Sequence, residues 1–143
     1  MKKLKLLILS GIPGSGKSTW ARKFIKTNSK EWIVVNRDSI RNMLGVYWIP
    51  NREGLVTIIE KNMITSALSE GYNVIIDATN LNPKTIAKWN ELVAKFDNVE
   101  IETKKFNISL RKAIFRDWKR GLLGGRKVGR KVIKKFYYKN YHY

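Results

Sequence analysis

Short apolar runs alternate along this chain with longer segments of helical periodicity. The runs rich in leucine, isoleucine and valine predict four strands, at residues 4–9, 32–35, 72–77 and 99–106. The segments with apolar residues every three to four positions predict helices at residues 19–25, 39–44, 53–69, 82–96, 109–120 and around 132–137. Strands that alternate with helices favour an α/β fold with a parallel sheet. Right-handed crossovers between four strands predict the order 2-3-1-4, with helices on both faces and ligands at the carboxyl ends of the strands.

Local signals mark the predicted helix ends. Asn82 stands before Pro83, which is the pattern of an N-cap followed by proline at the first helical position, and Ser109 is a second candidate N-cap. Gly71 is the expected stop of the helix at 53–69. We expect the buried face of that helix to consist of Leu55, Ile58, Ile59, Met63 and Ala67.

Length and composition favour one domain over residues 1–143, since the chain is 43% hydrophobic and long enough to bury a core. The sequence has no cysteine, which excludes disulfides and thiolate metal sites and fits a reducing compartment. No segment approaches the roughly 20 apolar residues that a membrane helix needs. We therefore expect a cytoplasmic protein without a membrane partner.

The charge is strongly positive, because 29 basic residues against 11 acidic ones give +18. Residues 111–139 alone hold twelve basic residues and one acid, Asp117. Such clustering favours a polyanionic partner, namely a nucleic acid. The alternative is a lysine-rich composition without functional meaning, since lysine outnumbers arginine twenty to nine.

A G-x-x-x-x-G-K-S motif at residues 11–18 joins the first predicted strand to the first predicted helix. In this context the glycines let backbone N–H groups and the helix N-terminus point at phosphate oxygens. Lys17 would reach the β- and γ-phosphates, and the Ser18 hydroxyl would bind Mg²⁺. The sequence therefore predicts a site for ATP or another nucleoside triphosphate with Mg²⁺. Its residues are Gly11, Gly14, Ser15, Gly16, Lys17, Ser18 and Thr19.

Asp38 follows the second predicted strand, at the sheet edge where the triphosphate must lie. A carboxylate there can orient an acceptor hydroxyl and take its proton. The competing interpretation is that Asp38 or Asn36 caps the short helix that follows. Arg41, one turn later, is placed to clamp an acceptor phosphate, or else is a solvated surface residue.

Asp77 ends the third predicted strand, which is the usual position of the second Mg²⁺-associated carboxylate in P-loop proteins. We expect it to act on the metal through water or to contact substrate, and the alternative is a strand-end cap. Thr79 and Asn80 follow as a polar turn able to contact substrate.

Lys112, Arg116 and Arg120 recur every four residues on one face of the predicted helix 109–120. Like charges at this spacing repel one another, and an anion between them would stabilise them. With Arg126 in the glycine-rich loop, they predict a lid over about residues 116–129 that supplies an arginine to the transferring phosphoryl group. The alternative is a solvated face in which the one acid of the segment pairs with Arg120.

At these residues the chain resembles the kinase domain of the bacteriophage polynucleotide 5′-hydroxyl kinase family. The matching segments are residues 1–3, 13–22, 36–38, 79–83 and 119–121. The resemblance implies ATP-dependent phosphorylation of 5′-hydroxyl ends of DNA or RNA.

By position, the resemblance makes Asp38 the general base and Arg41 the clamp on the acceptor phosphate. It makes Lys17 and Ser18 part of the phosphate loop, and Arg120 the lid arginine. The chain departs from the phage pattern at Ala78, where the family has its aspartate, because the acid here stands one residue earlier. An Asp-x-Asp-x-Thr signature is also missing, so 3′-phosphatase activity is not expected from these residues.

Two other functions are compatible with the same motifs. A kinase of a sugar, nucleoside or antibiotic hydroxyl would use the same loop and Asp38, but it would need no extended basic surface. A nucleotide-gated nucleic-acid-binding module would bind without phosphoryl transfer, against which the set of Lys17, Ser18, Asp38 and Asp77 argues.

Overall fold

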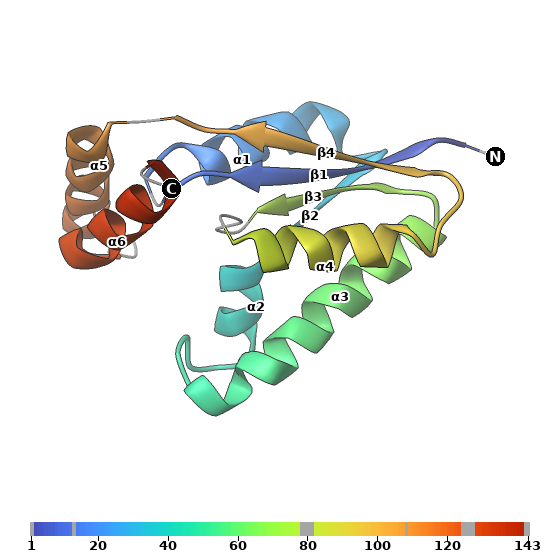
Figure 1. The fold of residues 1–143 in the computed structure, drawn as a ribbon, viewed down its shortest axis with the longest axis horizontal. Helices are drawn as coiled ribbons and strands as arrows, with labels where there is room; N and C mark the ends of the chain where they lie inside the picture. The colour runs from blue at the N-terminus through green and yellow to red at the C-terminus, as the bar shows by residue number, and fades with distance from the viewer. Residues whose placement is uncertain (1, 13, 78–81, 108, 124–127, 142–143) are drawn as a thin grey trace.

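The computed structural model describes residues 2–12, 14–77, 82–107, 109–123 and 128–141. Its centre is a four-stranded parallel sheet with the order β2-β3-β1-β4 (Figure 1). The strands are β1 (Leu4–Ser10), β2 (Trp32–Asn36), β3 (Asn73–Asp77) and β4 (Val99–Lys105). This arrangement confirms the α/β class and the strand order predicted from the sequence.

Helices cover both faces of the sheet, as Figure 1 shows, with α1 on one face and α3 and α4 on the other. Two more helices, α5 and α6, lie beyond the carboxyl ends of β1 and β3. The helices are α1 (Lys17–Asn28), α2 (Arg37–Met43), α3 (Glu53–Ser69), α4 (Pro83–Val93), α5 (Leu110–Leu122) and α6 (Arg130–Tyr141), with a 3₁₀ turn η1 (Pro50–Arg52) before α3.

The predicted N-caps form as expected. The Asn82 side chain accepts a hydrogen bond from the Lys84 N–H at 2.9 Å, and Ser109 accepts one from the Lys112 N–H at 3.3 Å. Among the described helices, none has both the length and the apolar character that crossing a membrane requires.

Apolar packing on the two faces of the sheet is unequal. Alternate residues of β1 and β3 face α3 and α4, where Leu6, Ile8 and Trp89 belong to the largest cluster of buried side chains. The opposite face has a smaller cluster under α1 that contains Leu9 and Ala21. β4 stands at the edge of the sheet with most of its residues exposed, as its interspersed charges predict.

The predicted buried face of α3 is wrong in part, because Ala67 is buried and Ile59 packs partly buried on the core, but the other three predicted residues are exposed. Leu55 and Ile58 are 47% and 56% exposed, whereas the helix buries Val56, Glu60 and Ile64 together with Ala67 and Leu68. The physical reason is Glu60, whose carboxylate pairs with cations from α2 and α4 and so faces inward. The pairing turns the neighbouring apolar positions of α3 toward solvent.

Candidate functional site

The phosphate loop follows β1 and ends at the first turn of α1. Gly14 and Gly16 have φ of 84° and 98°, a left-handed conformation that glycine adopts without strain. The Lys17 Nζ donates to the carbonyl oxygens of Gly11 at 2.9 Å and Ile12 at 3.4 Å, which keeps the ammonium inside the curve of the loop.

Two features of the loop fit a phosphate ligand. The Ser15 hydroxyl is buried, and among the described residues its oxygen lacks a hydrogen-bond partner. Gly11 packs tightly, since a Cβ at this position would lie 2.6 Å from the Ser15 Oγ and 2.9 Å from the Phe106 carbonyl oxygen. A buried donor without a partner, beside an ammonium and a helix N-terminus, is suited to phosphate oxygens.

A cleft of about 730 Å³ opens over this loop at the carboxyl ends of the strands. It brings together nine of the residues predicted from the sequence: Gly14, Gly16, Lys17, Ser18, Thr19, Asp38, Asp77, Arg116 and Arg120. Six further residues that line the cleft, and to which the sequence assigned no ligand-binding role, are Trp20, Arg22, Lys23, Asn36, Ser39 and Asn42. Thr79, Asn80 and Arg126 lie outside the described residues.

Asn36 links the ends of β2 and β3. Its Oδ1 accepts from the Ser39 N–H at 2.9 Å and so caps α2, while its Nδ2 donates to the Asp77 Oδ2 at 2.9 Å. Asp77 is 5% exposed and sits opposite Asn36 in the parallel register. The cap is therefore Asn36, which leaves the Asp38 carboxylate in the first turn of α2 to face the cleft.

Asp38 is held by two donors. Its Oδ1 accepts from the Arg41 Nη1 at 2.9 Å and from the Tyr47 hydroxyl at 2.6 Å. Tyr47 lies in the loop after α2, and nothing in the local sequence indicated this contact. The two bonds fix the direction in which the carboxylate points.

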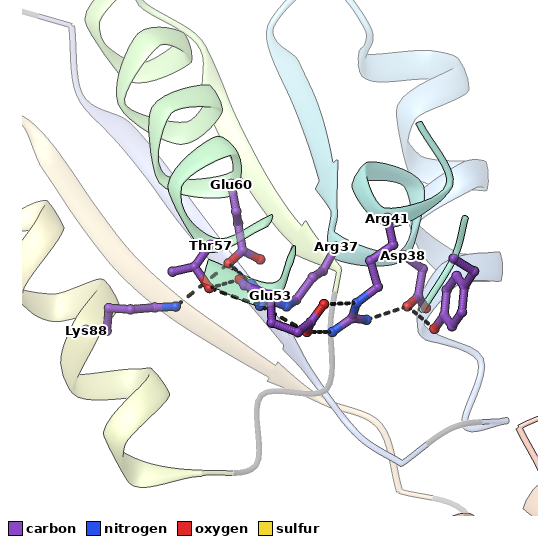
Figure 2. A network of polar contacts seen from close by, with 8 residues as sticks. Arg37, Asp38, Arg41, Glu53, Thr57, Glu60 and Lys88 are labelled. Carbon is purple, nitrogen blue, oxygen red and sulfur yellow. Dashed lines mark hydrogen bonds and ion pairs between the residues drawn. The ribbon is translucent and has the colours of Figure 1, made fainter. Parts of the chain in front are cut away.

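Arg41 points toward α3 (Figure 2). Its guanidinium donates to both carboxylate oxygens of Glu53, at 3.0 and 2.6 Å, and it is not among the residues that line the cleft. The hydrogen bond with Glu53 raises the pKa of Arg41, and the same bond is the main cause that lowers the pKa of Glu53. The role of Arg41 as an acceptor clamp stays a prediction, since its guanidinium contacts the carboxylates of Glu53 and Asp38 and lies over the rings of Tyr47 and Trp48.

The polar network continues from Arg41 and Glu53 to Arg37 and Glu60 (Figure 2). Arg37 donates to Glu60 at 3.0 Å and to the Thr57 hydroxyl at 3.0 Å, and Lys88 of α4 lies 3.8 Å from Glu60. Burial lowers the pKa of Lys88, and the charge of Glu60 partly offsets that effect. These contacts fix α2, and with it Asp38, against α3 and α4.

On the other side of the cleft, α5 reaches the phosphate loop. The Arg116 Nη1 donates to the Gly14 carbonyl oxygen at 3.2 Å. Arg120 also lines the cleft, and its Nη2 donates at 2.9 Å to Asp117. The Asp117–Arg120 pair that sequence reasoning gave as the alternative therefore forms, yet Arg120 still faces the cleft.

Asp117 is 1% exposed and is not the solvated acid that its basic surroundings suggested. Its Oδ1 accepts from the Val128 N–H at 2.6 Å, and its Oδ2 accepts from the Gly129 N–H at 2.9 Å. Burial alone would raise the pKa of Asp117, but these N–H groups and Arg120 overcome it, so the pKa lies below its usual value. The carboxylate thereby ties α5 to the start of α6.

Ile12, at a variable position of the loop motif, is a further contact that the sequence did not reveal. Its side chain is fully buried against Ile133 of α6, with Ile114 and Val128 packed around them. The helices α5 and α6 therefore pack directly on the phosphate loop.

The chain matches the protein-family model described as an AAA domain over residues 6–138. It therefore belongs to this family, and its loop, sheet order and cleft are those of a P-loop kinase domain. A domain of this class binds a nucleotide and transfers phosphoryl groups.

Individual relatives refine the picture. The chain is 30% identical over 131 residues to a protein of Autographa californica nuclear polyhedrosis virus named as a bifunctional polynucleotide kinase/RNA ligase, with 81% of this chain and 18% of the viral protein covered. It is 32% identical over 138 residues to the L-seryl-tRNA(Sec) kinase of Methanococcus maripaludis, with 94% of this chain and 51% of that protein covered. The chain thus spans about half or less of the length of these relatives.

Among solved structures, the chain is similar to one in the Pnkp1/Rnl/Hen1 RNA repair complex, with a TM-score of 0.88 and 32% identity. The match covers 99% of this chain and 45% of that chain. Similarity of this extent includes the phosphate loop, the sheet and the helices α5 and α6.

Proposed function

We propose that this chain transfers the γ-phosphate of ATP to the 5′-hydroxyl end of a nucleic acid strand. The observation that carries the proposal is one cleft that holds Lys17, Ser18, Asp38 and the two arginines of α5. Donor phosphates and a hydroxyl beside Asp38 would meet in that cleft.

The residues divide the work by position. Lys17 and the amides of the loop bind the β- and γ-phosphates, as the inward-held ammonium supports. Asp38 orients the acceptor hydroxyl and takes its proton as the new P–O bond forms and the bond from the γ-phosphorus to the β,γ-bridging oxygen breaks, which releases ADP. Arg120 and Arg116 neutralise charge on the phosphoryl group, and residues 116–129 act as a lid over the nucleotide.

Mg²⁺ fits the donors that the cleft provides. The Ser18 hydroxyl and the Asp77 carboxylate line the same cleft, and the described residues contain no cluster of three or more acidic, histidine or cysteine ligands. Such a sparse set of protein oxygens suits a metal that arrives with the triphosphate and keeps its waters. The metal would neutralise charge on the phosphates, with Ser18 as a direct ligand and Asp77 acting through water.

The nucleic acid acceptor is supported by charge and by relatives. The chain carries +18, and a strand of phosphates is the partner that such a surface favours. Two relatives, named as a polynucleotide kinase/RNA ligase and a seryl-tRNA kinase, act on hydroxyls attached to nucleic acids according to their names.

The test is transfer of labelled γ-phosphate from ATP with Mg²⁺ to DNA and RNA oligonucleotides with a 5′-hydroxyl, next to their 5′-phosphorylated twins. We expect label only on the 5′-hydroxyl strands, and its loss in Asp38→Ala. Label on the twins as well, or unchanged transfer by Asp38→Ala, would contradict the proposal. If none of the strands accepts label while the protein binds ATP, the proposal fails and the weight moves to a small-molecule acceptor.

A serine hydroxyl carried on tRNA is the second candidate acceptor. The observation that favours it is the 32% identity to the seryl-tRNA kinase over 94% of this chain. Seryl-tRNA in the same assay separates the two, because its label is released with the serine by mild base, whereas a 5′-terminal phosphate stays on the strand.

A further inference from the structure

The cleft extends beyond the phosphate loop into a space walled by α1 and α2. Arg22 and Lys23 of α1 line it on one side, and Ser39 and Asn42 of α2 line it on the other. All four residues are exposed, so their polar groups are accessible from the cleft. The sequence assigned no role to any of them.

This part of the cleft, between α1 and α2, is called the arm below, and it carries two cations, Arg22 and Lys23. In the part of the chain that the structure describes, no acidic group lies within ion-pair distance of Arg22 or Lys23, and Arg22 donates a 3.4 Å hydrogen bond to the Thr19 hydroxyl. An exposed arginine beside a hydroxyl and an amide has the donors that a phosphate group requires.

On the opposite side of α2, by contrast, the basic side chains are paired with acids. Arg37 and Arg41 both point toward α3, where the carboxylates of Glu53 and Glu60 pair with them. Of the cations around Asp38, those of α2 are therefore neutralised, and those on the α1 wall are not. An acceptor strand that leaves Asp38 between α1 and α2 therefore meets the uncompensated charge of Arg22 and Lys23.

We infer that the arm between α1 and α2 is the path of the acceptor strand, with Arg22 bound to a backbone phosphate near the reacting 5′-hydroxyl. Lys23 adds long-range attraction, and Ser39 and Asn42 donate hydrogen bonds to the same phosphate or to sugar oxygens. The inference rests on the proposed function, because it names how that acceptor is bound.

The phosphates of ATP are the other source of the same chemistry, so the experiment must separate donor from acceptor. We would compare Arg22→Gln with Lys26→Gln, a matched control on the same helix that is exposed but does not line the cleft. The measurements are KM for ATP, KM for a single-stranded 5′-hydroxyl oligonucleotide, and oligonucleotide affinity without ATP over a series of salt concentrations.

We expect Arg22→Gln to raise the acceptor KM about ten-fold, as loss of one charge-assisted phosphate contact implies, with KM for ATP unchanged. The slope of log affinity against log salt should become shallower by about 0.7, the value for one phosphate contact on a single strand. Lys26→Gln should behave as the wild type in each measurement.

An equal acceptor KM for Arg22→Gln and Lys26→Gln would overturn the inference while the proposed function stands. A raised KM for ATP with an unchanged acceptor KM would assign the arm to the donor and overturn it as well. If the wild-type protein transfers no phosphate to the oligonucleotide, the proposed function fails, and the acceptor path fails with it.

Discussion

Replacing Asp117 should loosen the pair of helices that carries Arg116 and Arg120. The carboxylate is 1% exposed and accepts three hydrogen bonds, from Arg120 and from the N–H groups of Val128 and Gly129. Asp117→Ala leaves two backbone donors without an acceptor, at about 1–3 kcal/mol each when water does not replace it. Since Val128 and Gly129 are half-buried, we expect a loss toward the lower end, about 2–4 kcal/mol in the free energy of unfolding.

The assay is urea unfolding followed by circular dichroism, with Asp97→Asn as the control. Asp97 is an exposed aspartate in the turn before β4, so its substitution should stay within about 0.5 kcal/mol of the wild type in free energy of unfolding. The loss of stability in Asp117→Asn should lie between those of Asp97→Asn and Asp117→Ala, because the amide oxygen still accepts one hydrogen bond while the amide nitrogen faces a donor. If Asp117→Ala unfolds at the same urea concentration as the wild type, the hydrogen bonds from Val128 and Gly129 to Asp117 do not stabilise the fold.

The pH dependence of the same carboxyl gives an independent check. Because the folded state lowers the pKa of Asp117, its contribution is complete above the unfolded pKa of about 3.9 and is lost as the pH falls through the folded pKa. Stability should therefore drop below about pH 4 in the wild type, and Asp117→Asn should lose less over that range. An equal drop in both proteins would show that other carboxyls dominate.

Two further substitutions test the loop and the Asp38 carboxylate. Gly11→Ala should lose about 1–3 kcal/mol of stability and bind ATP more weakly, because its Cβ meets the Phe106 carbonyl oxygen at 2.9 Å. The control is Gly54→Ala, at an open position of α3, which should gain about 0.5–1 kcal/mol of stability. Equal effects of the two substitutions in thermal unfolding would refute the argument. Tyr47→Phe should lower kcat roughly ten-fold at an unchanged KM for ATP, because Asp38 loses its 2.6 Å bond and its fixed direction; an unchanged kcat would make the bond structural only.

The sequence predicted the parts of the site that depend on short-range patterns. The loop motif requires its own turn, so the positions of Lys17 and Ser18 follow from a few adjacent residues. Asp38 and Asp77 were predictable because each ends an apolar run, and parallel strands bring their carboxyl ends to one edge. The same logic gave the strand order without any knowledge of contacts.

The parts that the sequence did not predict are pairings between distant residues. Glu60 on α3 is buried because Arg37, 23 positions earlier, and Lys88 on α4 reach it, and this pairing decides which face of α3 packs inward. Apolar periodicity alone favoured the other face. The Asp117–Arg120 pair was predictable from its spacing, but the partners of Asp117 at 128 and 129 were not, because they follow a loop whose course the sequence does not specify.

The packing of α6 on the phosphate loop shows why the loop and the arginines of α5 belong to one unit. Ile12 contributes its carbonyl oxygen to the Lys17 ammonium and its side chain to the contact with Ile133. A triphosphate would compete with the Gly11 and Ile12 carbonyl oxygens for this ammonium, and Ile12 is also the residue that anchors α6. Arg116 reaches the same loop through its bond to the Gly14 carbonyl oxygen. The described contacts thus join the loop to both α5 and α6, so we expect the arginines of α5 to keep their place over the loop rather than to move on a free hinge.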